Sequence, residues 1–271
     1  MTAPEASPEP VSARPVGLVV LLAGPGDTTD IVANELSRHV GTLEVVVEGS
    51  PSRVTMARRR AARVGWPTVI GQVLFVTLVL PVLRRVGRER ITQIEQEAGM
   101  DPTPRPGNHR VASVNAPEVI DLLGRLQPDV VVVNGTRIIG TAVLGSVPCP
   151  FVNTHAGITP RYRGVHGGYW ALAEGNPDLV GTTVHLVDQG IDTGGVLARA
   201  SFPVTRADSI ATYPYLHLAA GLPLLVDQVT RALDGEQLTP LVDDVAEGTS
   251  RLYLHPTVWA YGWRRIRSGV R

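Results

Sequence analysis

Four consecutive valines, Val130–Val133, constrain the fold of this chain more than any other feature. A strand that is apolar at every position has both faces buried, which is typical of a parallel sheet covered by helices on both sides. The first apolar run, Val16–Leu22, has the same character. It leads through a glycine-rich turn into a helical stretch, Thr28–Val40, and a second strand, Leu43–Val47. This order predicts an α/β fold with a doubly wound, mostly parallel sheet.

Further strands and helices are predicted from alternation and from helical spacing. The strands are Val111–Val114, Phe151–His155, Gly181–Val187 and Val196–Val204. The helices are Ala116–Leu126 and Asp208–Leu233, the second bent or started late around Pro214. We therefore expect one main domain over 16–234, preceded by a disordered tail over 1–15, which is rich in Pro, Ala and Ser, and followed by an extension over 235–271.

Residues 53–100 are predicted to be an inserted helical segment of unusual composition. Residues 53–90 hold nine arginines and one acid, and between the arginine clusters the twenty residues 64–83 carry no charge, which is transmembrane length. A spanning helix is rejected because the strands before and after the insertion must share one sheet, and Pro67 and Pro81 suggest broken helices. Three interpretations remain for the insertion: a helical hairpin packed on the core, a homodimer contact, or a membrane-surface helix whose basic flanks suit anionic lipid.

Composition excludes several classes of function. All 25 basic residues are arginine, so Schiff-base chemistry, a lysine-dependent phosphate loop and a lysine general base are excluded. The 25 acids balance them to a formal charge of zero, which does not favour a nucleic-acid partner. Cys149 is the single cysteine, which excludes an internal disulfide and fits a reducing cytoplasm. Proton transfer is left to His, Asp, Glu, Tyr or that cysteine.

Candidate catalytic groups gather at the end of the strand Phe151–His155. Alternation places Asn153 and His155 on the same face, at the edge of a parallel sheet where such folds hold ligands. Asp192 follows in the glycine-rich segment 188–195, where the backbone can approach a ligand closely. The three groups suit a reaction that builds an oxyanion: an amide donates to the oxygen, a histidine moves a proton, and a carboxylate supports the histidine.

The run NTHAGITPRYRGVHGGYWALAEGN, followed by GTTVHLVDQGIDTGGVL, resembles the folate-dependent formyltransferase family. That family includes glycinamide ribonucleotide transformylases, methionyl-tRNA formyltransferases and sugar N-formyltransferases. The family pattern of N-x-H at a strand end, then P-x-Y/W-x-G, then D-G/T-G is met in order, and the similarity covers about Asn115 to Asp234. The resemblance implies the Rossmann-like formyltransferase fold and 10-formyltetrahydrofolate as co-substrate, with no metal.

Site residues are implied by the same resemblance. Asn153 matches the asparagine that polarises the formyl carbonyl, His155 the catalytic histidine, and Asp192 the aspartate that supports it and orders a water. The residues implied to hold the pterin are Thr136, Arg137, Ile138, Ile139, Leu144, Asp188, Gln189, Gly190 and Ile191. Gly157 and Thr159 depart from the family's usual serine and leucine on the acceptor side. His185 is left open between packing and function.

The implied activity is N-formyl transfer, in which an unprotonated primary amine attacks the formyl carbon directly. The expected acceptor is a small molecule, a sugar nucleotide or a specialised-metabolite amine, and tRNA is not expected because fewer than 40 residues follow Asp234. The alternatives are a glycinamide ribonucleotide formyltransferase, a formyl-folate hydrolase and, from another class, a membrane-surface binding protein on a non-catalytic scaffold. The expected location is the cytoplasm, with a peripheral position on the inner membrane surface left open.

Overall fold

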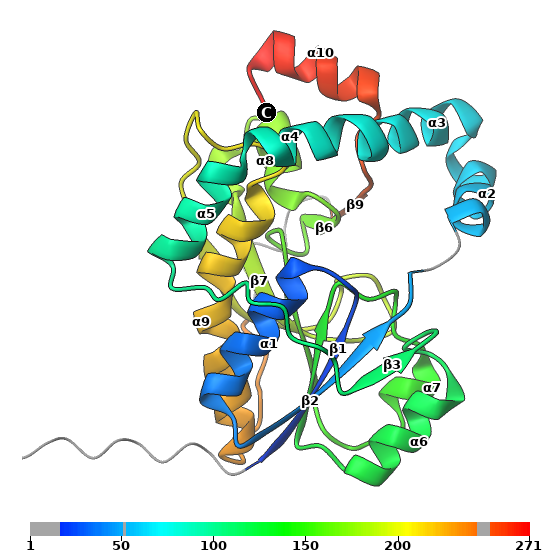
Figure 1. Ribbon diagram of the computed structural model, residues 1–271, viewed down its shortest axis with the longest axis vertical. Coiled ribbons are helices and arrows are strands. Elements are labelled where there is room, and N and C mark those ends of the chain that lie inside the picture. Colours follow the sequence, from blue (N-terminus) through cyan, green and yellow to red (C-terminus); the bar gives the residue numbers. More distant parts are fainter. Residues whose placement is uncertain (1–16, 51–52, 243–249) are drawn as a thin grey trace, which may run out of the picture.

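Seven strands form one twisted sheet in the computed structural model, which describes residues 17–50, 53–242 and 250–271 (Figure 1). The order across the sheet is β3-β2-β1-β4-β5-β7-β8. The strands are β1 (Leu18–Ala23), β2 (Thr42–Glu48), β3 (His109–Val111), β4 (Val130–Asn134), β5 (Phe151–His155), β7 (Gly181–Leu186) and β8 (Val196–Ser201). All pairs from β3 to β5 are parallel. Strand β7 pairs antiparallel with β5 on one side and with β8 on the other. The predicted doubly wound, mostly parallel fold is confirmed, whereas the tail 1–15 lies outside the described residues.

Helices cover both faces of the sheet, which explains why its central strands are apolar throughout. Helices α1 (Asp27–His39) and α9 (Tyr213–Leu233) pack on one face, and α6 (Pro117–Leu126) and α7 (Thr141–Leu144) pack on the other. Successive residues of β1 serve the two cores in turn: Leu21 belongs to the cluster with α1 and α9, and Leu22 to the cluster with α6. The exposed fraction of both side chains is 0%.

The C-terminal residues pack back onto the body of the molecule. Strand β9 (Arg251–Tyr253) pairs in parallel with β6 (Tyr162–Gly164), which is followed by α8 (Gly167–Ala173) and the short 3-10 helix η2 (Pro177–Leu179). Helix α10 (Val258–Ser268) buries Tyr261 against Phe75 and Tyr169. Strands β6 and β9, with three residues each, are too short to carry a periodic pattern in the sequence. The start of α9 at Tyr213 agrees with the expected late start, because Pro214 fits the first turn of a helix.

The insertion contains one long continuous helix. After α2 (Arg53–Val64), the chain runs through α3 (Trp66–Leu74), the π-helical turn η1 (Phe75–Val79) and α4 (Leu80–Val86), and then enters α5 (Arg88–Glu97) (Figure 1). The expectation that prolines break this segment is wrong. Pro67 lies in the first turn of α3, and Pro81 directly follows the π-turn, in which the Leu80 N–H bonds to the Phe75 carbonyl. The wider turn relieves the clash that a proline otherwise makes in a helix.

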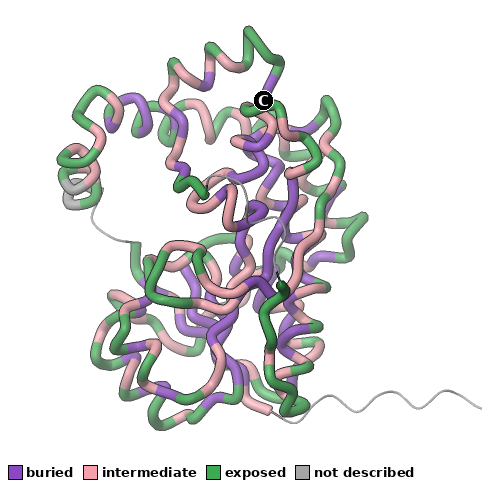
Figure 2. Tube along the Cα trace, turned by 180° about the vertical axis from the view of Figure 1, so that it is seen from behind, coloured by how far each residue is buried: buried purple, intermediate pink, exposed green. Residues whose placement is uncertain are grey.

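The long helix is exposed along most of its length. Among the described residues, one helix, Trp66–Val86, is long and apolar enough to cross a bilayer. Only 22% of its most apolar 18-residue stretch is buried inside the protein. Its buried anchor is Phe75, whose ring packs against His166 and Tyr261. The strands of the sheet are mostly buried, whereas the helices of the insertion are mostly exposed or intermediate (Figure 2). The insertion therefore touches the core along one side only and is not a packed hairpin.

Three histidines in the interior make the stability of this fold depend on pH. Burial lowers the pKa of His166 to about 3, that of His217 to about 3 and that of His255 to about 4, against about 6.5 in an unfolded chain. Below pH 6.5 the unfolded chain therefore binds more protons than the folded one, so stability is full above pH 6.5 and falls as the pH drops toward 4. We expect each histidine to cost about 2 kcal/mol of unfolding free energy at pH 5.

Urea unfolding at pH 7.5, 6 and 5 measures this effect. In His217→Phe the unfolding free energy should fall by about 2 kcal/mol less between pH 7.5 and pH 5, because one of the three histidines is gone. His39→Gln is the control: the His39 side chain, at the end of α1, is 43% exposed, and this variant should show the same fall as the unaltered protein. An unfolding free energy that stays constant from pH 7.5 to 5 would contradict the prediction.

Candidate active site

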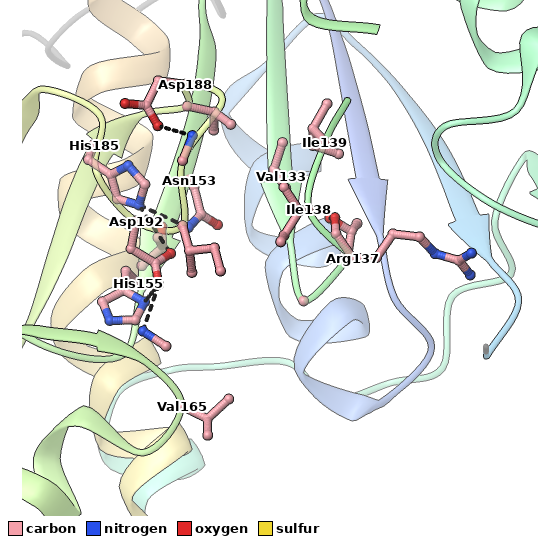
Figure 3. A pocket seen from close by; sticks show the side chains of 17 residues that line it. Val133, Arg137, Ile138, Ile139, Asn153, His155, Val165, His185, Asp188 and Asp192 are labelled. Carbon is pink, nitrogen blue, oxygen red and sulfur yellow. Dashed lines mark hydrogen bonds and ion pairs between the residues drawn. The ribbon is translucent and has the colours of Figure 1, made fainter. Parts of the chain in front are cut away.

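A cavity of about 400 Å³ lies at the carboxyl ends of β4 and β5 (Figure 3). Residues 133–139, at the end of β4 and in the loop after it, form one wall, and residues from 187 to 192, in the loop after β7, form the other. The polar side chains Asn153, His155 and His185 stand between the walls. The edge of a parallel sheet where the strands end is the usual ligand position in this class of fold, as expected from the sequence.

Asn153 is oriented by His185 across the junction of β5 and β7. The antiparallel register places the two residues opposite each other, and Nδ2 of Asn153 lies 3.1 Å from Nε2 of His185. Nδ1 of His185 lies 2.7 Å from the carbonyl oxygen of Leu186, so this nitrogen must be the donor. Burial lowers the pKa of His185, which keeps the ring neutral and leaves Nε2 as an acceptor for the Asn153 amide. The second N–H of that amide is left for an occupant of the cavity.

His155 presents one particular nitrogen to Asp192. Its Nε2 lies 2.7 Å from the carbonyl oxygen of Tyr162, so Nε2 carries a hydrogen in either charge state of the ring. Its Nδ1 lies 3.4 Å from Oδ2 of Asp192. Nδ1 is therefore the ring nitrogen that faces Asp192. The histidine is 5% exposed, so bulk water screens this pair little.

Asp192 is held in place by the loop and by β6. Oδ2 of Asp192 accepts the Gly164 N–H at 2.8 Å, and the backbone of Asp192 is left-handed, with φ of 51°. Oδ1 lies 3.8 Å from Nε2 of His185, so the carboxylate sits between the two histidines. Asp188 shapes the loop itself by accepting bonds from the Gly190 N–H at 2.9 Å and the Thr193 hydroxyl at 2.7 Å.

Most of the implied pterin-binding residues line the cavity. Those that do are Thr136, Arg137, Ile138, Ile139, Asp188, Gly190 and Ile191. The Arg137 side chain points away from the cavity, with Nε 2.6 Å from Oε2 of the buried Glu48, so this residue offers its backbone (Figure 3). Gln189 is exposed and does not line the cavity. Leu144 does not line the cavity either. In α7 it is Val143 that is buried in the core, whereas Leu144 lines a separate hollow beside Phe151.

Two residues near the cavity, His185 and Glu48, hold other parts of the site in position, a role that the sequence analysis did not predict for them. His185 orients Asn153, and the signal for it would be the β5–β7 register, which alternation within one strand does not reveal. Glu48, at the end of β2, accepts the backbone N–H groups of Val114 and Arg137 and thereby ties the β4 loop to the sheet edge. An acid that directly follows the apolar run Val45–Val47 is the signal for this role, and Glu48 is 4% exposed.

The titratable groups of the cavity do not form a metal site. Within the described ranges no three His, Cys, Asp or Glu side chains are grouped so that they could hold a metal ion. His155 and His185 present their nitrogens to opposite oxygens of Asp192. The arrangement suits proton movement and hydrogen-bond donation to an oxygen of a cavity occupant.

Comparisons with known proteins agree with this geometry. A family model described as formyl transferase matches residues 84–222, about half of the chain. A methionyl-tRNA formyltransferase from Synechococcus sp. (strain JA-3-3Ab) is 33% identical over 175 residues, which cover 64% of this chain and 52% of that protein. One from Anaeromyxobacter dehalogenans (strain 2CP-1) is 29% identical over 212 residues, covering 72% of this chain and 67% of that one. The chain thus spans about half the length of the first of these relatives.

Solved structures of similar fold include two kinds of formyltransferase. A glycinamide ribonucleotide transformylase from Symbiobacterium toebii aligns with a TM-score of 0.53 at 16% identity, covering 85% of this chain and 94% of that one. A sugar N-formyltransferase from Shewanella sp. aligns with a TM-score of 0.51 at 14% identity, covering 84% and 74%. At 14% and 16% sequence identity, these similarities show a shared fold and nothing about the acceptor. Together with the family match over residues 84–222, the shared fold confirms the resemblance read from the sequence, and the chain belongs to the formyl transferase family.

Proposed function

We propose that this protein transfers a formyl group from 10-formyltetrahydrofolate to a primary amine of a small-molecule acceptor. The observation that carries the proposal is the arrangement of Asn153, with a free amide N–H, beside the His155–Asp192 pair. A hydrogen-bond donor and a proton-transfer pair at one end of a cavity are what acyl transfer to an amine requires. When bound, the folate supplies an activated formyl group.

The cavity fits the flat, polar-edged ring system of a folate. Val133 and Ile139 on one wall and Val187 and Ile191 on the other provide apolar surfaces on both sides. Glycines in both loops let backbone groups approach an occupant, as at Gly135, which has φ of 64°. Apolar walls with a few fixed polar groups are typical of cofactor sites of this size.

Each catalytic group has a distinct task in this proposal. Asn153 donates to the formyl oxygen and stabilises the negative charge that develops on it. Protonated His155 donates from Nδ1, and Asp192 holds the proton at that atom. The reacting amine must be unprotonated to attack. As its nitrogen bonds to the formyl carbon, it releases a proton toward Asp192. That proton passes to the folate nitrogen as the bond between this nitrogen and the formyl carbon breaks, so that tetrahydrofolate leaves.

An anionic acceptor such as a sugar nucleotide is supported by charges next to the catalytic pair. Strand β6, which supplies Gly164 to the cavity, carries Arg163, whose Nη1 donates to the Ile191 carbonyl oxygen at 3.1 Å. Arg161 precedes β6, and Arg251 begins β9 with its Nη1 3.5 Å from Oε1 of Glu174. Arginine binds phosphate groups through two parallel hydrogen bonds. A zero formal charge over the whole chain favours a small anion over a nucleic acid. Mass spectrometry of a panel of amines, including aminosugar nucleotides and glycinamide ribonucleotide, identifies the formylated product, and formate released without an amine would indicate a hydrolase.

Thermal unfolding with 5-formyltetrahydrofolate, a stable analogue, tests the folate site. At one hundred times its dissociation constant the ligand should stabilise the protein by about 2.7 kcal/mol. Ile138→Ala, which trims a wall of the cavity, should reduce the shift. Leu144→Ala is the matched control, because Leu144 lies in the separate hollow and its removal should leave the shift unchanged. No shift of the unaltered protein at millimolar ligand would overturn the proposed function.

A further inference from the structure

A stripe of apolar side chains runs along the exposed side of the long helix. Its members follow at intervals of four residues, so each side chain neighbours the next on the helix surface and the row winds gradually around the helix axis. They are Ile70, Leu74, Leu78, Val82 and Val86. Leu78 is 61% exposed and Val86 is 78% exposed, so the stripe is not covered by the rest of the protein. Soluble proteins rarely expose a continuous apolar surface of this kind without using it.

Helix α10 extends this stripe into a broader surface. A Cβ atom on Gly71 would lie 2.4 Å from the ring of Trp259, so the two helices meet where glycine leaves room for the indole. Trp259, Trp263 and Ile266 are themselves exposed, and Figure 1 shows α10 lying along the long helix. We call the stripe on the long helix together with these three residues the apolar face.

Exposed arginines lie in the same segments as the apolar face, and three of them, Arg84, Arg85 and Arg88, also line a hollow to which Asp27 and Glu95 contribute. The exposed arginines are Arg58, Arg63, Arg84, Arg85 and Arg88 on the insertion and Arg265 and Arg267 on α10. Residues 53–88 and 251–271 contain no aspartate or glutamate. A patch of this composition is complementary to an anionic surface with an apolar interior. It is poorly suited to a second copy of the chain, because a two-fold dimer would place like charges against each other.

The long helix cannot span the bilayer, although its length and composition would allow it. Strand β2 ends before the insertion and β3 begins after it, and these two strands pair with each other in parallel, with Val46 opposite His109. Both ends of the insertion must therefore stay on the same side of a membrane. The buried side of the helix is also occupied, since Phe75 packs against His166 and Tyr261.

We propose that the apolar face docks on an anionic membrane surface, with the long helix lying in the plane of the interface. The stripe enters the boundary between headgroups and acyl chains, and the indole rings of Trp259 and Trp263 occupy the headgroup level, where tryptophan is enriched. The exposed arginines bind lipid phosphates. The insertion leaves the sheet at the carboxyl end of β2, the same edge at which the catalytic cavity opens, so docking holds that edge near the bilayer (Figure 1). The proposal does not depend on the folate chemistry.

Flotation of the full chain with lipid vesicles at physiological salt tests the docking. We expect the protein to float with vesicles of equal parts phosphatidylcholine and phosphatidylglycerol, and to remain in solution with phosphatidylcholine alone. The double variant Leu78→Glu/Val82→Glu should lose flotation by tenfold or more. Val242→Glu is the matched control, because Val242 is a 98% exposed apolar residue outside the apolar face, and this variant should float like the unaltered protein.

The charge contribution is measured separately. Arg85→Gln and Arg88→Gln should each weaken binding to the mixed vesicles about fivefold, and Arg125→Gln on α6, away from the apolar face, should not. Thermal unfolding confirms that each variant is folded. The proposal is overturned if folded protein stays in solution with the mixed vesicles, or if the double variant floats as well as the unaltered chain. It is equally overturned if sedimentation shows a soluble dimer that Leu78→Glu dissociates, since a second copy would then cover the face.

Discussion

Asp192→Asn is expected to lower formyl transfer about a thousandfold while leaving the fold and the folate site intact. Asparagine has the same shape as aspartate, tolerates the left-handed backbone of this position, and can still accept the Gly164 N–H through its amide oxygen. What it removes is the negative charge 3.4 Å from Nδ1 of His155. Without that charge the protonated histidine is no longer stabilised where proton transfer takes place.

The measurement is kcat together with folate affinity for the purified variant. We expect kcat to fall while the thermal shift with 5-formyltetrahydrofolate is retained. Asp188→Asn provides a contrast within the same loop. Asp188 accepts bonds from Gly190 and Thr193 and contacts neither His155 nor His185 through a hydrogen bond or ion pair in the described structure. It should affect folate affinity more than kcat. Near-full activity of Asp192→Asn would remove Asp192 from the mechanism.

Asn153→Ala is expected to reduce kcat by about a hundredfold to a thousandfold. The variant loses the N–H that faces the cavity and leaves Nε2 of His185 without the donor that lies 3.1 Å away. Folate affinity should change little, because the apolar walls and the loop backbones remain.

A second asparagine beside the cavity serves as the matched control. Asn115 donates to the Ile138 carbonyl oxygen at 2.8 Å and accepts the Gly140 N–H, so it shapes the wall without facing the reacting atoms. Asn115→Ala should therefore raise KM for the folate more than it lowers kcat. If the two variants show the same split between kcat and KM, Asn153 acts by shaping the cavity and not by donating to the oxygen.

The central sheet could be predicted from the sequence because each of its main strands carries its own burial pattern. Val130–Val133 is apolar throughout and is buried in the middle of the sheet. The short strands β6 and β9 could not be predicted, because each has three residues and their partners lie some ninety positions apart. The continuity of the helix through Pro81 depends on a π-turn, which leaves no periodic signal in the residues.

The catalytic groups were predictable to different degrees. Asn153 and His155 share a face because they are two positions apart on one strand, which is a property of the local chain. The position of Asp192 beside His155 depends on how the loop folds. The glycine-rich segment made Asp192 a candidate, and the family resemblance gave it a place beside the histidine. The pairing of Asn153 with His185 depends on a register next to a bulge at Val184 and His185. Such long-range geometry is set by packing of the whole sheet.

The insertion and the candidate site lie at different places in the sheet, so each can change in evolution without the other. The insertion fills the connection between β2 and β3, whereas the side chains of the candidate site come from β5, from β7 and from the loop between β7 and β8, toward the other end of the strand order. A crossover at this edge can be lengthened, shortened or exchanged while the strands that carry Asn153 and His155 keep their register. The insertion and the candidate site thus come from different parts of the sheet, and the membrane contact proposed for the insertion is independent of the chemistry proposed for the site.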